Sequence, residues 1–172
     1  MWKEGINLRK KKRTPKMGMR CPYCGRPVQF RSASYVYGTH NLNPENYLYV
    51  CNGYPEQCDA YVGAQKVSLQ PMGTLANGEL RHKRIEAHRA LDRIWKEGYM
   101  TRRSAYIWLQ YRLGLREKDM HIALFSDYYC DETIRECKAY MELWAANNRS
   151  EVKKDLNVSN RKHIEKEGML WS

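Results

Sequence analysis

Hydrophobic and polar residues follow two different periods along the chain. Between residues 21 and 66, aromatic residues and valines alternate with polar residues in PVQFRSASYVYG and NYLYV, and the turn-rich GTHNLNPE separates the two stretches. Alternation of this kind is typical of short strands that pair as hairpins. The first part of the chain is therefore predicted to form a small antiparallel sheet.

From about Ala76 onward, the hydrophobic positions recur at helical spacing. Three apolar stripes follow one another, formed by Leu80, Ala87, Leu91 and Ile94 or Trp95, by Ala105, Trp108, Leu109 and Leu113, and by Cys130, Ile134, Cys137, Met141 and Trp144. Gly98 and Gly114 are expected to stop the first two helices, and Thr101 and Ser126 to cap the second and third. The pattern predicts a small bundle of about three helices.

Four cysteines bracket the predicted strands and have the spacing of a zinc site. Cys21 and Cys24 lie in CPYCG, and Cys51 and Cys58 lie in CNGYPEQC. A structural Zn²⁺ ion takes four ligands in a tetrahedron, and four thiolates leave no open position to activate water. We expect one structural Zn²⁺ bound by these four residues. The predicted fold class is α+β, a small zinc ribbon of short antiparallel strands packed on the helical bundle.

Cys130 and Cys137 are interpreted differently. They are seven residues apart on one predicted helix and share its apolar stripe, so their thiols are about 10 Å apart. That separation is too large for a single metal ion. We expect both to be core residues.

The composition divides the chain into four parts. Residues 1–20, which include RKKKR, have little apolar content and are expected to form a basic flexible arm. Residues 21–66 form the predicted ribbon, and a linker containing SLQPMG leads to the helical bundle at 75–147. Residues 148–172 are expected to be a polar tail with at most one short helix, near NRKHIEKE.

The positive charge is concentrated in two regions. The formal net charge is +11, of which residues 1–20 carry +7 and residues 71–113 carry +5, whereas 21–70 is neutral and 114–172 carries −1. A zinc ion with four thiolates would reduce the total to about +9. A charge of this size favours polyanionic partners.

Basic and aromatic residues occur together in the predicted ribbon, where seven of the thirteen tyrosines fall between Tyr23 and Tyr61. Proteins that bind single-stranded nucleic acid combine cations for the backbone with aromatic rings for the bases. The candidate nucleic-acid-binding residues are Lys10, Lys11, Lys12, Arg13, Arg26, Arg31, Tyr35, Tyr37, Tyr54, Arg81, Arg84, Arg102 and Arg103. The alternatives are that the tyrosines pack on the helices and that the basic helix face is solvated and ion-paired.

Two stretches resemble known families. The segment from CPYCG to CDAYVG is similar to the small zinc ribbons at the C-terminal end of bacterial type I topoisomerases, which implies binding of single-stranded DNA. A longer series resembles a zinc-finger-containing family common in phages and prophages of Gram-positive bacteria, and its motifs are SYVYG, CDAYVG, PMGTLANGELRHKRIEAHRALDRIWKEG, TRRSAYIWLQYRLGL and HIALF. This resemblance implies a phage or prophage origin and implies no activity.

The sequence gives little support for catalysis. The segment EAHRALD offers Glu86, His88 and Asp92, and His82 precedes it by one turn. A metal-dependent nuclease built on these four residues is the enzyme hypothesis, but none of the common catalytic motifs is present. A surface ion pair is the simpler interpretation of His88 and Asp92.

We therefore expect a non-enzymatic, zinc-ribbon accessory protein that binds DNA or RNA. Its apolar runs are too short to cross a bilayer, and MWKEGINLRKKKR lacks the apolar stretch of a signal peptide, so a cytoplasmic location and no membrane partner are expected. The alternative function is a protein-binding inhibitor or modulator of a host complex, for example one in defence or nucleic-acid processing.

Overall fold

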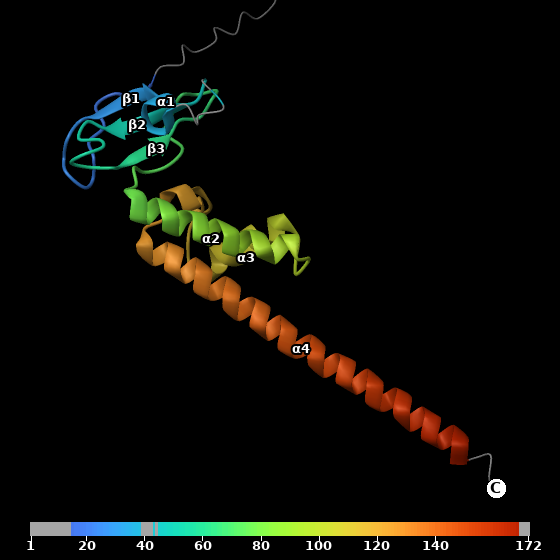
Figure 1. Ribbon diagram of the computed structural model, residues 1–172. Helices are drawn as coiled ribbons and strands as arrows, with labels where there is room; N and C mark the ends of the chain where they lie inside the picture. The colour runs from blue at the N-terminus through green and yellow to red at the C-terminus, as the bar shows by residue number, and fades with distance from the viewer. Residues whose placement is uncertain (1–14, 39–42, 44, 169–172) are drawn as a thin grey trace, which may run out of the picture. The chain divides into compact units, whose positions relative to one another are not determined.

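The computed structural model describes residues 15–38, 43 and 45–168, with side chains up to Asn148 (Figure 1). The chain divides into two compact units with the boundary after His82. We call them the ribbon unit, up to His82, and the helical unit, from Lys83 onward. Strands occur in the first and long helices in the second, which confirms the α+β class.

The ribbon unit contains a three-stranded antiparallel sheet in the order β1-β2-β3. The strands are β1 (Val28–Ser32), β2 (Tyr47–Cys51) and β3 (Tyr61–Gly63). Val28 is paired with Cys51, and Leu48 with both Arg31 and Gly63. The short antiparallel strands are those that the alternating pattern predicts.

The chain after β1 differs from the expected strand. Ser34–Tyr37 forms one helical turn, α1, in which the backbone N–H groups of Val36 and Tyr37 donate to the Ala33 carbonyl at 3.1 and 3.0 Å. Ala33 is buried with helical dihedrals, and its N–H donates to Asn46 at 2.8 Å, so the chain turns there. The alternation of apolar and polar residues alone does not predict such a turn.

The segment that we expected to be a linker closes the ribbon instead. Ala64 forms a bridge with Pro71, and the Tyr49 hydroxyl donates to the Leu69 carbonyl at 2.6 Å. Leu75 is buried in the ribbon core, at 3% exposure. Residues up to the start of the first long helix therefore belong to the ribbon.

The sheet has a small core on each face, because side chains alternate along β2. On one face, Tyr49 and Cys51 pack with Cys21, Ala60, Val62 and Leu75. On the other, Leu48 and Val50 pack with Ala33, and Tyr54 and Tyr61 cover them. The metal-ligand cysteines lie with the first cluster, and a group of tyrosines with the second.

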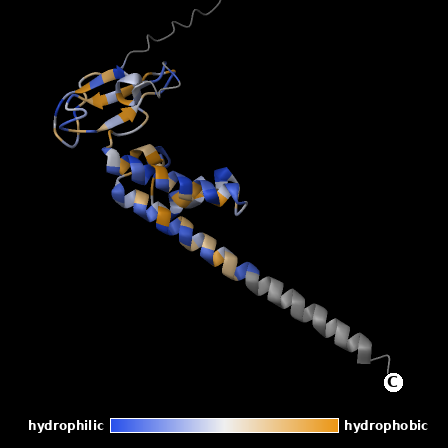
Figure 2. Cartoon of the chain, viewed as in Figure 1, coloured by the Kyte–Doolittle hydropathy of each residue, from blue (hydrophilic) through white to orange (hydrophobic). Residues whose placement is uncertain are grey.

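The first long helix, α2 (Gly78–Lys96), alternates hydrophobic and hydrophilic bands (Figure 2). Its start is capped twice, because the Asn77 side chain accepts from Leu80 N–H at 3.0 Å and Asp59 accepts from Gly78 N–H at 2.6 Å. The expected apolar stripe is buried, comprising Leu80, Ala87, Leu91 and Ile94. The helix ends before Gly98, as predicted.

The second long helix, α3 (Arg102–Leu113), has the predicted ends. The Thr101 hydroxyl accepts from Ser104 N–H at 3.2 Å, and Gly114 adopts the left-handed conformation with φ of 62°. Ala105 and Leu109 are fully buried. Both ends of this helix follow from local sequence signals.

The turns η2 (Glu117–Asp119) and η3 (Ile122–Leu124) lead to the last helix, α4 (Asp127–Gly168). This helix is longer than the expected third helix, because it continues through the region that we expected to be a polar tail. No glycine or proline occurs between Asp127 and Gly168, so nothing in the sequence breaks it.

Cys130 and Cys137 are fully buried on α4, as predicted for core residues. Burial raises the pKa of the Cys130 thiol to about 11 and that of the Cys137 thiol to about 12.

In the part of the chain that the structure describes, no helix is both long and apolar enough to cross a membrane.

Candidate metal centre and aromatic face of the ribbon

The sulfur atoms of Cys21, Cys24, Cys51 and Cys58 converge at one place, all within 4.8 Å of one another. The Cys21 and Cys58 sulfurs are 3.6 Å apart, and those of Cys24 and Cys51 are 3.3 Å apart. A zinc ion with four sulfurs at about 2.3 Å in a tetrahedron requires sulfur separations of about 3.8 Å. The donor set and its size fit one structural Zn²⁺.

Backbone geometry places each cysteine pair. In the first knuckle, Gly25 has φ of 70° and its N–H donates to the Cys21 carbonyl at 2.9 Å, which turns the chain back between the two ligands. In the second, Gly53 N–H donates to the Cys51 sulfur at 3.4 Å, and Cys58 N–H donates to the Gly53 carbonyl at 3.1 Å. The extra residues of CNGYPEQC form this wider turn.

The same backbone groups set the electrostatics of the thiols. The backbone N–H of Arg26 lowers the pKa of the Cys24 thiol, whereas burial raises the pKa of Cys51 and Cys58. Zinc binds the thiolate form, so occupancy of the site requires that all four thiols release their protons. N–H groups directed at sulfur compensate part of that charge.

Among the described residues, these four cysteines are the only group of three or more potential ligands close enough to hold one metal ion. The four residues of the nuclease hypothesis, His82, Glu86, His88 and Asp92, do not form such a group. Asp92 accepts from Lys96 at 2.7 Å and from the Trp95 indole at 3.2 Å. Its carboxylate is thus engaged within α2.

On the opposite face of the sheet, four tyrosines form a continuous series of ring contacts, which we call the tyrosine row. The ring centroids of Tyr35 and Tyr54 are 6.0 Å apart, those of Tyr54 and Tyr61 are 6.2 Å apart, and those of Tyr61 and Tyr37 are 5.9 Å apart. The Tyr37 hydroxyl also donates to the Tyr61 hydroxyl at 3.2 Å. These rings come from α1, the second knuckle and β3.

Two arginines lie over rings of the tyrosine row. The Arg31 guanidinium carbon is 5.3 Å from the Tyr35 ring centroid, and that of Arg81 is 3.7 Å from the Tyr61 centroid. Arg31 is exposed and donates to the side chain of Gln29 at 2.9 Å. Arg31 has no carboxylate partner among the described side chains, so its charge is available to an anion.

Arg81 has a structural role in addition to its place in the row. Its guanidinium donates to the backbone carbonyls of Asp59 and Ala76 at 2.7 and 2.6 Å and forms an ion pair with the Asp59 carboxylate at 3.3 Å. Burial raises the pKa of the Tyr61 hydroxyl to about 12. Arg81 therefore holds Tyr61 in position within the tyrosine row. Its charge is largely compensated by the Asp59 carboxylate and the two backbone carbonyls.

Arg26 is exposed and its side chain lies against the second knuckle, since a methyl group at Gly53 would approach the Arg26 Cδ atom to 3.3 Å. Tyr54 follows Gly53 directly in the sequence. The structure thus brings Arg26, Arg31, Tyr35, Tyr37, Tyr54 and Arg81 into one unit.

The prediction for Arg84 is wrong. Arg84 is 9% exposed, and its guanidinium donates twice to the Phe125 carbonyl, at 2.9 and 2.8 Å. It lies between Leu80 and Ala87 on the apolar stripe of α2, which is the sequence signal for its burial. A guanidinium in this position cannot contact a partner.

The remaining candidate nucleic-acid-binding residues are not part of the tyrosine row or its arginines. Arg102 and Arg103 are exposed and belong to the helical unit. Lys10, Lys11, Lys12 and Arg13 lie outside the described residues.

Sequence reasoning missed Tyr61 as a member of the tyrosine row. In CDAYVG, Tyr61 and Val62 must point to opposite faces of β3, and Val62 is buried with the metal-ligand cysteines. That alternation was the available signal for a tyrosine on the other face.

Comparison with known proteins supports the metal assignment. A family model described as a zinc-finger-containing domain matches residues 17–140, which include all four cysteines and the tyrosine row. Curated proteins and solved structures gave no significant match. With four cysteines arranged for one structural Zn²⁺ inside the matched region, the chain belongs to this family of zinc-finger-containing domains.

Proposed function

We propose that the ribbon unit binds single-stranded nucleic acid on the tyrosine row, without catalysis, and that the structural Zn²⁺ holds this surface in place. The observation that carries the proposal is the continuous contact of four rings at 5.9 to 6.2 Å, with the uncompensated cation Arg31 over one of them. Rings and cations side by side are the two components of single-strand binding surfaces.

The exposed members of the row offer faces for bases. Tyr35 and Tyr37 are 51% and 44% exposed, whereas Tyr54 and Tyr61 are partly buried. A base stacked on an aromatic side chain contributes about 1–3 kcal/mol, whatever its identity. Phosphate contacts are expected from Arg31 and Arg26, because Asp59 already neutralises Arg81.

An unpaired strand is the form of nucleic acid that suits this surface. Stacking on tyrosine requires a base whose face is free, which a duplex does not offer except at its ends. We therefore expect weaker binding to duplex than to single strands of equal length.

The sequence resemblances add context to the proposal. They support an accessory protein of phage or prophage origin that acts in the cytoplasm of the host, where single strands arise during replication and transcription.

The experiment is fluorescence anisotropy with labelled 15-nucleotide DNA and RNA strands and the matching duplexes. We expect the logarithm of the affinity for single strands to fall linearly with the logarithm of the salt concentration. Tyr35→Ala and Arg31→Ala should each weaken binding, by about 5- to 100-fold for the tyrosine. Tyr111→Ala is the matched control, because Tyr111 is 82% exposed in the helical unit and outside the row.

Binding that is equally strong in Tyr35→Ala and Tyr111→Ala would reject the tyrosine row as the contact surface. Failure to bind any single strand, with tight and salt-insensitive capture of one purified host protein, would favour the alternative modulator function.

A further inference from the structure

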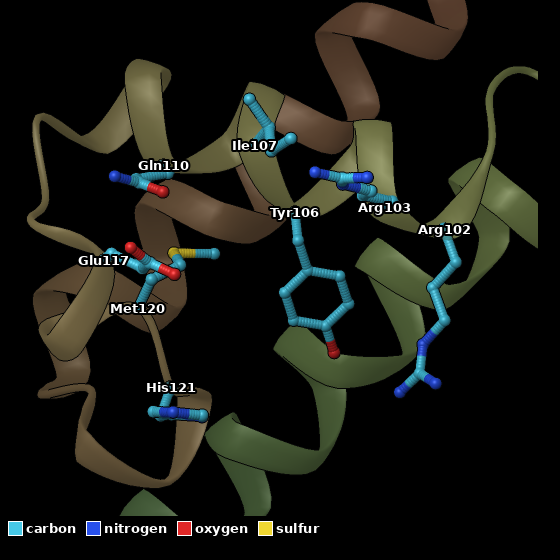
Figure 3. Close-up of a pocket in the computed structure, with 8 residues that line it drawn as sticks. All are labelled: Arg102, Arg103, Tyr106, Ile107, Gln110, Glu117, Met120 and His121. Carbon is cyan, nitrogen blue, oxygen red and sulfur yellow. The ribbon is translucent and has the colours of Figure 1, made fainter.

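The helical unit contains a pocket of about 820 Å³ that the ribbon site does not use (Figure 3). One side is formed by α3, through Arg102, Arg103 and Tyr106. The other side is formed by η2 and the turn after it, through Glu117 and Met120. Its size is within the range of pockets that bind small organic ligands.

One end of the pocket is cationic. Arg102 and Arg103 are exposed, and among the described side chains neither has a carboxylate partner. Arg112 on the same helix is instead paired with Glu136 at 2.6 Å, and Arg116 after the helix with Asp119 at 2.6 Å. Figure 3 shows the two side chains directed apart, that of Arg102 towards the hydroxyl end of Tyr106 and that of Arg103 towards Ile107. Guanidinium groups without counter-ions make this end of the pocket attractive to a phosphate group.

Arg102 is also held in position by aromatic rings. Its guanidinium carbon is 5.7 Å from the Tyr106 ring centroid and 5.8 Å from that of Trp95. These contacts restrict the side chain before any ligand binds, which reduces the entropy that binding must overcome. Both arginines stand at the N-terminal end of α3, where the helix dipole also favours an anion.

The other end of the pocket has hydrogen-bonding groups around an apolar surface. Figure 3 shows Gln110, Glu117 and Met120 on the side of Tyr106 away from Arg102. Met120 is 6% exposed, and the Glu117 carboxylate forms no ion pair among the described side chains. A carboxylate and an amide can accept from the exocyclic amine of a base.

We propose that this pocket binds one nucleotide, with its phosphate at the cationic end that Arg102 and Arg103 form and its base between Tyr106 and Met120. The edge of the base is then directed to Glu117 and Gln110. Glu117 favours a base with an exocyclic amine, such as cytosine, over uracil, and it disfavours an acidic peptide, whose carboxylates it would repel. The ligand is a free nucleotide or the terminal nucleotide of a strand, since both present the same phosphate and base.

The test is calorimetric titration of the full-length, zinc-loaded protein with CMP, UMP and the nucleoside cytidine. We expect CMP to bind at least about 10-fold more tightly than cytidine, because cytidine lacks the phosphate that the arginines recognise. The double variant Arg102→Ala, Arg103→Ala should weaken CMP binding by a similar factor. Glu117→Gln should reduce the preference for CMP over UMP, from about 5-fold or more towards none.

Two controls make the result specific. Arg89→Ala removes an exposed arginine of α2 that does not line the pocket, and it should leave CMP binding unchanged. Tyr35→Ala, in the tyrosine row, should also leave it unchanged, which separates this pocket from the proposed strand-binding surface. Circular dichroism checks that each variant is folded.

A titration of the Tyr35→Ala variant, in which the tyrosine row is weakened, with a 5′-phosphorylated pentanucleotide distinguishes the two sources of ligand. Tighter binding than CMP assigns the pocket to a strand end, and weaker binding assigns it to free nucleotides. The proposal is overturned if CMP and UMP show no binding at millimolar concentration, or if Arg89→Ala weakens binding as much as the double variant does.

Discussion

Arg81 is stacked on Tyr61, with 3.7 Å between the guanidinium carbon and the ring centroid. The same guanidinium donates to two carbonyls, of Asp59 and Ala76, and pairs with the Asp59 carboxylate. Asp59 in turn caps the first turn of α2 by accepting from Gly78 N–H at 2.6 Å. One side chain thereby connects the start of the helix to the β3 strand and to the tyrosine row.

This arrangement predicts that Arg81→Lys destabilises the protein even though the charge is kept. A lysine ammonium cannot stack on Tyr61 while it donates to both carbonyls. We expect a loss of about 1–3 kcal/mol in the free energy of unfolding, measured by denaturant titration. Arg31→Lys is the control, with an expected change under about 0.5 kcal/mol because Arg31 is exposed. Equal effects of the two variants would contradict a special role for the stack.

The four-sulfur site predicts a 1:1 complex whose loss affects the ribbon unit. Replacing zinc by Co²⁺ should give the absorption of tetrahedral thiolate coordination, and Cys51→Ser should abolish the tight site. Cys130→Ala is the matched control, because Cys130 is buried on α4 and should leave the Co²⁺ spectrum unchanged. A Co²⁺ spectrum that changed in Cys130→Ala would show that a cysteine of α4 binds the metal, and it would contradict the four-cysteine site.

Chelation of the metal should unfold the ribbon unit, because each face of its sheet carries only a small core and the four thiols hold both knuckles. Amide hydrogen exchange should show lost protection in β1 to β3 and retained protection in α3. Uniform loss of protection along the chain would contradict independent stability of the helical unit.

Burial of Arg84 predicts that its substitution lowers stability far more than substitution of an exposed arginine on the same helix. Arg84→Ala removes both donors to the Phe125 carbonyl and leaves space in a buried site, so we expect the free energy of unfolding to fall by about 2–4 kcal/mol. Arg89→Ala on the exposed side of α2 should change it by less than about 0.5 kcal/mol. Similar midpoints in urea for the two variants would show that the Phe125 contact contributes little.

Features that depend on local sequence could be predicted, and those that depend on distant contacts could not. The Thr101 cap, the Gly114 stop and the Cys21–Cys24 knuckle each follow from spacing within four residues. The Arg84 contact joins residues 41 positions apart, and the Arg81 contact with Asp59 joins residues 22 positions apart. The candidate nucleic-acid-binding residues chosen by residue type therefore included the buried Arg84 together with exposed arginines.

The candidate site shows the same division. The alternating pattern predicts strands around the tyrosines, but the turn at Ala33 decides that Tyr35 and Tyr37 lie on α1. Pairing with Tyr54 and Tyr61 then comes from tertiary structure. The metal ligands were predictable because their chemistry needs only residue type and spacing.

The ion pair between Arg112 and Glu136 predicts a pH-dependent contribution to stability. Arg112 donates to the Glu136 carboxylate at 2.6 Å, and this hydrogen bond lowers the pKa of Glu136 below its usual value of about 4.3. The folded state therefore binds the proton less readily than the unfolded state. The stabilisation is complete above the unfolded pKa and is lost as the pH falls through the lower, folded pKa.

Glu136→Gln isolates this contribution. At pH 7 the variant should be less stable than wild type by about 1 kcal/mol, a modest value because the Arg112 side chain is 55% exposed. The difference should shrink as the pH is lowered below about 4.3, since Glu136 is then increasingly protonated in both states of the wild type. Urea unfolding of both proteins at pH 7, 5 and 3.5 measures it. Because acid affects the zinc site equally in both, a difference that stayed constant or grew towards pH 3.5 would show that the carboxylate charge is not what Arg112 stabilises.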